Sequence, residues 1–460
     1  MKLTMSKYSV YIALILSAVL GTACDDFLDE RPDSNLVDSD VFASEANAEA
    51  AVAGAYRSLL SNLYYGQRLP VINALSAQEL RDPANANANY LEFVNHNVQP
   101  TNPVLIDLWA QIYNGVQAAN KIIAYVPGLE ADEALINRFL AEAYFLRGLH
   151  YFNLVRAFGN VPLYLTPITS TEEEQIQVAN SSVDQVYEQI LEDLTMAERM
   201  MPADYQEAGR ASLWAVKALL AKVQLYRGNY EAAAASAQEV LAGPFSLASD
   251  YASIFSTDGD SETILELWFD ERSGNNAVGI VTLPVGDPYG GQGVPLIAYS
   301  TPEGDTLDYP IIDFYAEEDL RRQSLFYNNG EYYYIIKYIS QPNYDDISLI
   351  RLPEVLLIYS EATARNAGSV TPEAFEAYNA VRTRANVPDA ITNYPSVESF
   401  VDAVVEEKRR ELLLENEEWF DYVRAGKADE FGVTDPNDYL YPIPQEERDF
   451  NPKLEQNPGY

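Results

Sequence analysis

Cysteine and histidine are almost absent from this chain, whose 460 residues include one cysteine and two histidines. One cysteine excludes an intrachain disulfide, and no group of these residues has the spacing of a zinc site. A Ser-His-Asp triad needs a histidine beside a serine and an acid. His150 lies in the apolar helical segment LRGLHYFNLV and is predicted to be a core residue. His96 lies in an Asn-rich segment and is expected to face solvent or ligand.

Positive charge is scarce as well. Lys and Arg total 30 against 69 Asp and Glu, which gives a net charge of −39. Such a charge repels nucleic acid phosphates and anionic lipid surfaces, so nucleic acid is excluded as a partner. A polyanionic ligand is disfavoured for the same reason.

Motifs for enzymes and cofactors are also missing. The glycine-rich stretch 286–293 lacks the Lys-Ser/Thr pair of a phosphate loop and is predicted to be a flexible loop. We therefore assign no catalytic residue, no cofactor and no metal ligand. Two alternatives stay open. A glycosidase needs only two carboxylates at a set separation. The Asp-rich loop 257–262 is either a calcium site or a solvated acidic loop.

The N-terminus has the features of an export signal. Lys2 and Lys7 precede an apolar run over 8–20, and small residues lead to Cys24. The run is shorter than the roughly 20 residues that span a bilayer. This arrangement resembles a bacterial lipoprotein signal, which predicts cleavage after residue 23 and lipidation of Cys24. The acidic segment 24–40 then forms a tether between the lipid and the folded domain.

Apolar residues recur with helical spacing along most of the remaining chain. The predicted helices are 41–63, 104–126, 131–158, 182–201, 208–227, 230–242, 351–367, 372–385, 397–416 and 417–425. The segment 211–242 resembles a tetratricopeptide repeat, in which Gly228 makes the turn and Tyr230, Ala233 and Ala237 pack the second helix onto the first. The fold class is therefore all-α, a superhelix of tetratricopeptide-like helical pairs.

Regions without helical spacing interrupt this scaffold. Asn and Pro residues over 64–103 are expected to break any regular element. Residues 262–269 predict a strand, 274–304 a loop, and 324–339 a β-hairpin around Asn329-Gly330 with Tyr332, Tyr334, Ile336 and Tyr338 on one face. One domain over 41–460 results: a helical scaffold (41–243 and 350–425), an insertion with short strands (244–349) and an extended tail packed on the body (426–460).

Tyrosine is abundant, at 33 residues, and suits half-exposed surfaces because it has an apolar face and a polar tip. Aromatic faces stack on sugar rings, and planar polar side chains bind their hydroxyl groups. The two irregular regions supply both kinds of side chain, with Tyr327 and Asn328 near the second region. The candidate ligand-binding residues are Arg81, Tyr90, Asn95, Trp268, Tyr289, Gln292 and Tyr299.

Several motifs in order along the chain resemble the SusD/RagB-type outer-membrane lipoproteins of Bacteroidetes. They include AEAYFLRG at 141–148, FGNVPL at 158–163, RLPEVLL at 351–357 and EWFDYVR at 418–424. The resemblance implies a lipid-anchored location at the outer membrane, facing the cell exterior. It also implies a partner, a SusC-like TonB-dependent transporter, over which the lipoprotein sits as a lid. The motifs belong to the scaffold, so Trp109, Trp419 and Arg351 are read as packing residues.

These observations predict a non-enzymatic lipoprotein that captures oligosaccharides at the cell surface and delivers them to the transporter. An alternative keeps the fold and the partner but replaces the glycan with peptides or another nutrient. A more distant alternative is an extracellular glycosidase.

Overall fold

The computed structural model describes residues 41–286, 289–291, 295–298, 301–303, 306–308, 310–340 and 342–460. The predicted leader and tether with Cys24, and the candidate residues Gln292 and Tyr299, lie outside these ranges. No helix of the described residues has the length and apolar content needed to cross a membrane.

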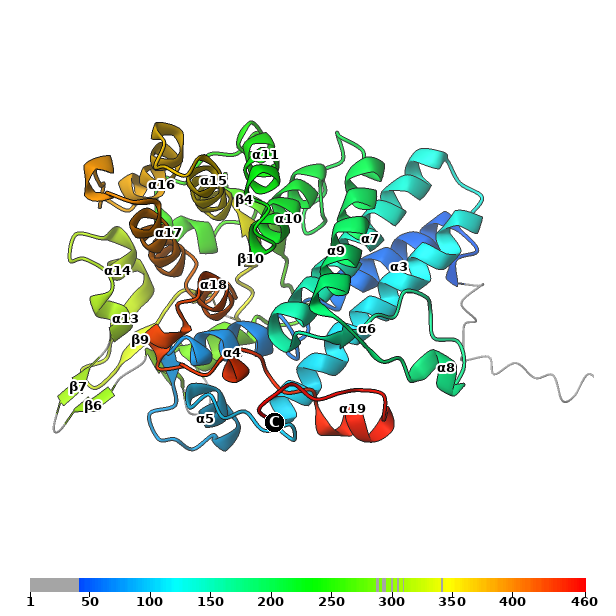
Figure 1. The fold of residues 1–460 in the computed structure, drawn as a ribbon, viewed down its shortest axis with the longest axis horizontal. Coiled ribbons are helices and arrows are strands. Elements are labelled where there is room, and N and C mark those ends of the chain that lie inside the picture. The colour runs from blue at the N-terminus through cyan, green and yellow to red at the C-terminus, as the bar shows by residue number, and fades with distance from the viewer. Residues whose placement is uncertain are drawn as a thin grey trace, which may run out of the picture.

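Helices dominate the described chain, as the all-α prediction requires, and Figure 1 shows them stacked side by side along the long axis of the molecule. The helices of the first half are α3 (Glu45–Arg57), α4 (Arg68–Ser76), α5 (Ala88–Val94), α6 (Pro103–Tyr125), α7 (Glu133–Phe158), α8 (Glu173–Ile176), α9 (Val183–Met200), α10 (Leu213–Tyr226) and α11 (Tyr230–Leu241). Those of the second half are α12 (Ala277–Thr282), α13 (Pro310–Asp313), α14 (Leu320–Leu325), α15 (Leu352–Ala367), α16 (Pro372–Arg384), α17 (Val397–Glu411), α18 (Glu418–Ala425) and α19 (Gln445–Phe450).

The strands form five short antiparallel pairs. These are β1 (Leu80–Arg81) with β5 (Ile297–Ala298), β2 (Val161–Pro162) with β3 (Asn180–Ser181), β4 (Thr263–Leu267) with β10 (Ile347–Arg351), β6 (Thr301–Glu303) with β7 (Thr306–Asp308), and β8 (Phe326–Asn328) with β9 (Tyr333–Ile335). Four of the pairs lie wholly or partly in the insertion, which gives it a framework of its own beside the helices.

The tetratricopeptide-like pair is present as predicted. Helices α10 and α11 pack against each other, and the turn between them contains Gly228 at φ 71°, a conformation that costs a glycine little. Ala233 and Ala237 are fully buried, which lets the two helices approach closely. Helix α10 begins later than predicted because Ser212 caps it by accepting a hydrogen bond from the Ala215 amide.

The prediction that 64–103 contains no regular element is wrong. Every residue of α4 after Arg68 is buried, so the segment has no polar face and no helical period in its sequence. Pro70 is tolerated because it lies in the first turn, where its missing amide has no partner to lose. Asn87 starts α5 by accepting hydrogen bonds from the amides of Asn89 and Tyr90.

The insertion follows its prediction in part. The strand predicted at 262–269 is β4, but its partner β10 was not predicted. The expected loop 274–304 contains α12, whose start is capped by Asn276, and β5. The hairpin turns at Gly330, which has φ 97°. Strand β9 ends at Ile335, so the expected shared face extending to residue 338 is wrong.

Two further boundaries differ from the sequence expectation. Helix α17 ends at Glu411 rather than continuing to 416, because Leu414 and Asn416 adopt positive φ angles. The C-terminal tail packs on the body as predicted, for example through the Asn457 amide, which donates to the Phe158 carbonyl at 2.9 Å. It also contains the short helix α19, which was not predicted.

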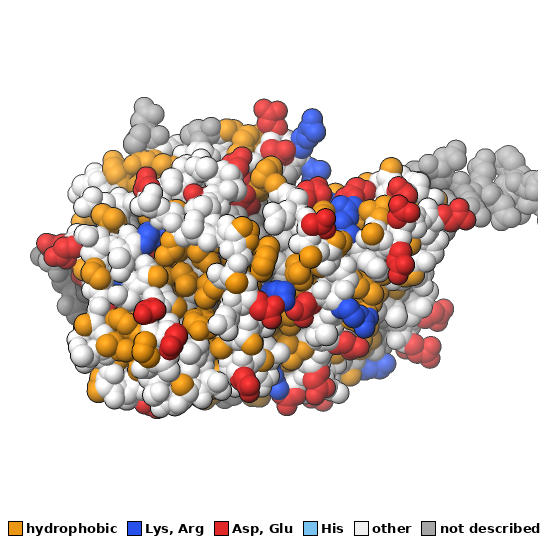
Figure 2. Space-filling view, turned by 90° about the horizontal axis from the view of Figure 1, so that it is seen from above, with side chains coloured by type: hydrophobic (Ala, Val, Ile, Leu, Met, Phe, Trp, Pro, Cys, Tyr) orange, Lys and Arg blue, Asp and Glu red, His pale blue; other side chains and the backbone are white. Residues whose placement is uncertain are grey.

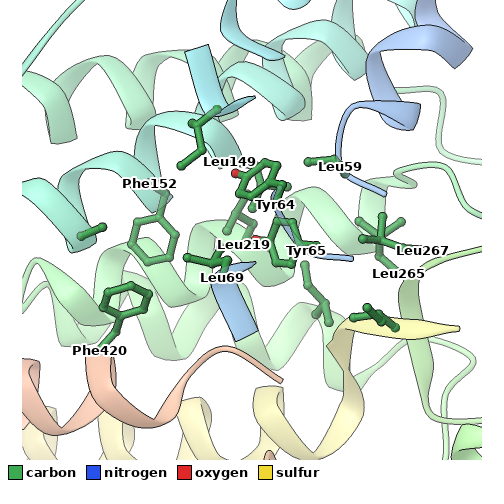
Figure 3. Packing of buried hydrophobic residues seen from close by; sticks show 14 of the residues in the cluster. Leu59, Tyr64, Tyr65, Leu69, Leu149, Phe152, Leu219, Leu265, Leu267 and Phe420 are labelled. Atoms are coloured by element: carbon green, nitrogen blue, oxygen red, sulfur yellow. The ribbon is translucent and has the colours of Figure 1, made fainter. Parts of the chain in front are cut away.

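A buried aromatic cluster joins the N-terminal helices to the insertion (Figure 3). Tyr64 and Tyr65, just before α4, pack in one core with Phe152 of α7 and Leu265 of β4. The buried amide of Asn153 donates to both tyrosine hydroxyls, at 2.6 and 2.8 Å, which satisfies polar groups that burial would otherwise penalise.

Both histidines are packed against aromatic rings. His150 is fully buried, as predicted, and its ring stacks on Tyr64 with centroids 5.7 Å apart. His96 is half-buried, and its ring lies 4.9 Å from that of Trp419. Burial lowers the pKa of His150 to about 3 and that of His96 to about 4.

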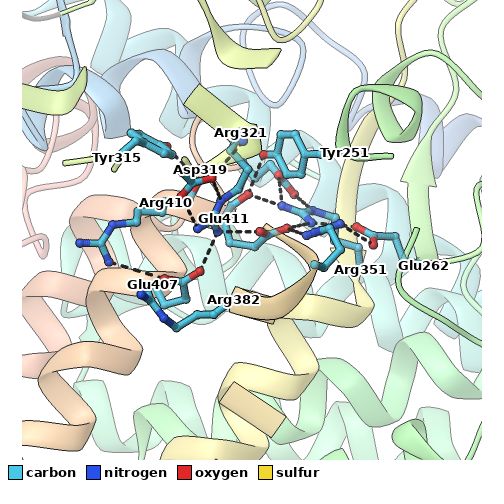
Figure 4. Close-up of polar contacts among 12 residues, drawn as sticks. Tyr251, Glu262, Tyr315, Asp319, Arg321, Arg351, Arg382, Glu407, Arg410 and Glu411 are labelled. Atoms are coloured by element: carbon cyan, nitrogen blue, oxygen red, sulfur yellow. Dashed lines mark hydrogen bonds and ion pairs between the residues drawn. The ribbon is translucent and has the colours of Figure 1, made fainter. Parts of the chain in front are cut away.

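The insertion is attached to the C-terminal helices by a buried ionic network centred on Arg351 (Figure 4). Arg351, the last residue of β10, is fully buried and donates to Glu262 at 2.9 Å and to Glu415 at 2.7 Å. It also donates to the carboxylate and the backbone carbonyl of Glu411. Trp109 and Trp419 are buried as well, in line with the packing roles that the resemblance implied.

Glu411 is the most shared carboxylate of this network. It contacts three guanidinium groups, those of Arg321, Arg351 and Arg384. Burial by itself raises the pKa of the Glu411 carboxyl, but the guanidinium groups outweigh burial and hold its pKa well below the usual 4.5. The carboxylate is therefore charged at neutral pH.

Glu411→Gln is expected to lower the free energy of unfolding by about 3–5 kcal/mol, because it leaves buried guanidinium charges without their partner. Urea denaturation followed by circular dichroism measures the change. Glu406→Gln is the matched control on the same helix. Its carboxylate is 37% exposed and pairs only with Arg410 at 3.3 Å, so a loss below about 1 kcal/mol is expected. Equal losses in the two variants would show that the network does not stabilise the fold.

The stability difference between wild type and Glu411→Gln should depend on pH. Because the folded pKa of Glu411 is lowered, its contribution is fully present above the unfolded value of about 4.5 and is lost as the pH falls toward the folded pKa. The difference in the free energy of unfolding between wild type and Glu411→Gln should therefore be constant from pH 7 to about pH 5 and become smaller at lower pH. A gap that widens on acidification would contradict the lowered pKa.

Candidate ligand-binding face

Three of the segments that carry candidate residues or hairpin tyrosines meet around strand β5. Arg81 on β1 pairs with Ile297 of β5, and β5 also lies against β9 of the hairpin. Arg81 is half-buried. The sequence separation between Arg81 and Ile297 exceeds two hundred residues, so only the fold brings them together. We give the name hairpin face to Arg81, the residues 284–286 and 289–291, and the β8–β9 hairpin.

Tyr289 lies on this face, between two short stretches of backbone that hydrogen-bond to each other. The Gly291 amide donates to the Pro284 carbonyl at 2.9 Å, and the Gly290 amide donates to the Gly286 carbonyl at 2.7 Å. A Cβ atom on Gly291 would lie 1.9 Å from the Leu283 carbonyl oxygen. The loop can therefore close at this point only with glycine.

Tyr289 forms an aromatic pair with the hairpin. Its ring lies 5.0 Å from that of Tyr327 at an interplanar angle of 65°, an edge-to-face arrangement that stabilises both rings. Tyr327 stands opposite Tyr334 in the register of β8 and β9. Tyr289 and Tyr327 are half-buried, so part of each ring remains accessible.

The turn of the hairpin is fixed by its own amide side chains. Asn328 accepts a hydrogen bond from the Gly330 amide at 2.7 Å. Asn329 accepts from the amides of Glu331 and Tyr332 at 2.9 and 2.8 Å. These side chains accept hydrogen bonds from backbone amides that have no strand partner in a tight turn. The turn is therefore held in one conformation, which supports the tyrosines on the two strands.

Tyr90 lies on α5, which follows β1, and Asn95 is the C-cap residue of that helix. Tyr90 is only 8% exposed, whereas Asn95 is exposed at the end of the helix. Asp82 organises the connection between β1 and α5, because its carboxylate accepts from the Ala84 and Asn87 amides at 2.9 and 2.8 Å. The roles of Asp82 and Gly291 were missed in the sequence, although an Asp or a Gly beside turn residues is a usable signal.

Trp268 lies apart from the hairpin face. It follows β4, and its ring is 41% exposed at the edge of a cavity of about 260 Å³ formed with residues of α10 and the loops 206–212 and 256–262. Trp268 and Tyr289 are only 21 residues apart, yet β4 pairs with β10 and not with β5.

The Asp-rich loop 257–262 is stabilised by local hydrogen bonds. Asp260 accepts from the Glu262 amide at 3.1 Å, and Asp258 and Asp260 are exposed or half-exposed. Within the residues that the structure describes, no group of three or more His, Cys, Asp or Glu side chains is arranged to hold a metal ion.

The hairpin face combines accessible aromatic rings with a guanidinium and amide groups. Aromatic rings of this kind bind the apolar faces of ligands, and the polar groups supply directed hydrogen bonds.

Comparisons with known proteins agree with the fold. Residues 26–225 match the family described as "Starch-binding associating with outer membrane", and residues 322–435 match the SusD family. A SusD-like protein of Formosa agariphila, P2, is 27% identical over 99% of this chain and 100% of its own. A SusD-like protein of Bacteroides ovatus is 27% identical over 90% of this chain and 82% of its own.

Solved structures give the same result. A laminarin-binding SusD-like protein is 26% identical, with a TM-score of 0.78, and the match covers 91% of this chain and 100% of the other. A SusD superfamily protein from Bacteroides thetaiotaomicron has a TM-score of 0.75 at 24% identity, over 90% of this chain and 100% of the other. The motifs, the fold and the two matched regions together place this chain in the SusD/RagB family, a family of binding proteins associated with the outer membrane.

Proposed function

We propose that this protein binds oligosaccharides at the hairpin face and delivers them to a SusC-like TonB-dependent transporter at the outer membrane. The observation that carries the proposal is the Tyr289–Tyr327 pair, two partly accessible rings 5.0 Å apart. Arg81 belongs to β1, which pairs with β5, and β5 lies against β9 of the hairpin. Membership of a family that includes starch-associated and laminarin-binding proteins supports the same ligand class.

The charge of the chain favours a neutral ligand. At −39 the protein repels anions, so uncharged glycans meet no electrostatic barrier. Stacking on Tyr289 and Tyr327 supplies affinity, and the Arg81 guanidinium supplies hydrogen bonds that orient the sugar hydroxyls. The role is binding and release without bond cleavage, so the protein acts as a lid that captures ligand before transport.

Tyr289→Ala and Tyr327→Ala are each expected to weaken oligosaccharide binding by about 1–3 kcal/mol, or about 5- to 150-fold, because each removes a buried aromatic contact with the ligand. Isothermal titration of the fragment 25–460 with a panel of neutral hexasaccharides measures the change. Tyr289→Phe keeps the ring and should retain most of the affinity, which separates stacking from a role of the hydroxyl.

Phe450→Ala is the control for loss of an exposed aromatic elsewhere. Phe450 is 58% exposed on α19, outside the hairpin face, so its removal should leave binding unchanged. Full affinity in both tyrosine variants would refute the assignment of this face. If the protein binds peptides but none of the glycans in the panel, the ligand class in this proposal is wrong. The fold and the proposed transporter partner would be unaffected by that result.

The lipid anchor is a separate part of the proposal. Cys24→Ser should move the protein from the membrane fraction to the soluble fraction, because it removes the only thiol that can be lipidated. Fractionation of cells that express each form tests this, and the melting temperature of the released protein should match that of the fragment 25–460. Retention of Cys24→Ser in the membrane fraction would exclude this anchor.

A further inference from the structure

Trp268 is held in one orientation by a buried carboxylate. Its indole Nε1 donates to Oε1 of Glu266 at 2.6 Å, and the same oxygen accepts from the Gly259 amide at 2.8 Å. Glu266 is only 5% exposed, whereas Trp268 is 41% exposed. The ring is therefore fixed at its polar edge while much of it stays open, so no rotamer freedom has to be lost when a ligand stacks on it.

The cavity beside Trp268 has a second aromatic wall. Trp214 and Phe245 line it and pack edge to face with their rings 6.3 Å apart. The volume of about 260 Å³ lies just below the roughly 300–1,000 Å³ of sites for drug-sized ligands. The cavity thus suits a ligand of about one ring with part of a second, and not a folded peptide.

A glycine turn of the helical body packs against one part of the indole. Gly209 has φ 71°, and a Cβ built on it would lie 3.7 Å from the indole Cγ, so bare backbone contacts the ring there. Arg210 anchors this turn, because its guanidinium donates to Glu142 at 2.6 Å and to Glu49 at 2.8 Å. The scaffold therefore helps to set the position of the indole.

We propose that the Trp268 cavity is a second carbohydrate site, which takes one neutral sugar ring against the indole. Glu207 and Glu266 line the cavity and disfavour acidic sugars. None of the residues that line it belongs to the hairpin face, so the proposal holds whether or not that face binds glycan. Two sites on one chain raise the avidity for a long polysaccharide, because the second contact is intramolecular.

The test uses tryptophan fluorescence, since the chain has four tryptophans. Trp109 and Trp419 are buried, and Trp214 is half-buried, so a neutral quencher such as acrylamide acts chiefly on Trp268. The probes are methyl glycosides and disaccharides of glucose, mannose, galactose and xylose at millimolar concentration. At least one probe should reduce the quenching constant by about two-fold or more, and Trp268→Phe should abolish that effect.

A further variant makes the result specific. Tyr289→Ala should leave protection of Trp268 intact. Failure of every probe to protect Trp268, or loss of protection in Tyr289→Ala, would overturn the proposal of a separate site. The hexasaccharide titrations of the tyrosine variants test the hairpin face independently.

Discussion

The buried ionic network around Arg351 is the interaction on which the arrangement of the insertion depends. Several charges are removed from water there, and the attraction between them repays that cost only when every donor and acceptor is used. Arg351 meets this condition, because its donors reach Glu262, Glu411 and Glu415. Apolar contacts have no preferred direction, so an apolar cluster of the same size would let β10 shift along α17. The directed hydrogen bonds of Arg351 define one position of β10 relative to α17.

The same network sets the position of the hairpin face. Arg321, near the start of the helix that leads into β8, donates to Glu411 at 2.9 Å. Lys337, two residues after β9, donates to the Leu413 carbonyl at 2.6 Å and pairs with Glu415. The segments before and after the hairpin are thus bonded to Glu411, the last residue of α17, and to the residues that follow it. Figure 4 shows Arg321 beside Glu411.

The sequence predicted the helical scaffold well because those helices have one buried and one exposed face. It failed at α4, where burial on all sides removes the periodic pattern, and at β10, whose five residues adjoin a helix. The candidate site was predictable only as a set of residue types. Pairing of β1 with β5 brings Arg81 to Ile297, while Trp268 follows β4, which pairs with β10. Both pairings are long-range, and local pattern carries no information about them.

The buried ion pairs also determine which charged groups remain on the surface to contact ligands. The buried cations, each paired with a carboxylate, are Arg147, Arg156, Arg210, Lys222, Arg321, Lys337, Arg351 and Lys408. The surface therefore has fewer positive groups than a composition with 30 Lys and Arg suggests, and Figure 2 shows acidic side chains spread over the face that it displays, with apolar ones gathered between them. Such a surface cannot attract anions and gains little from charge when it binds a neutral ligand. Affinity for an uncharged glycan must then come from apolar contact and directed hydrogen bonds, which are what the Tyr289–Tyr327 pair and the Trp268 cavity provide.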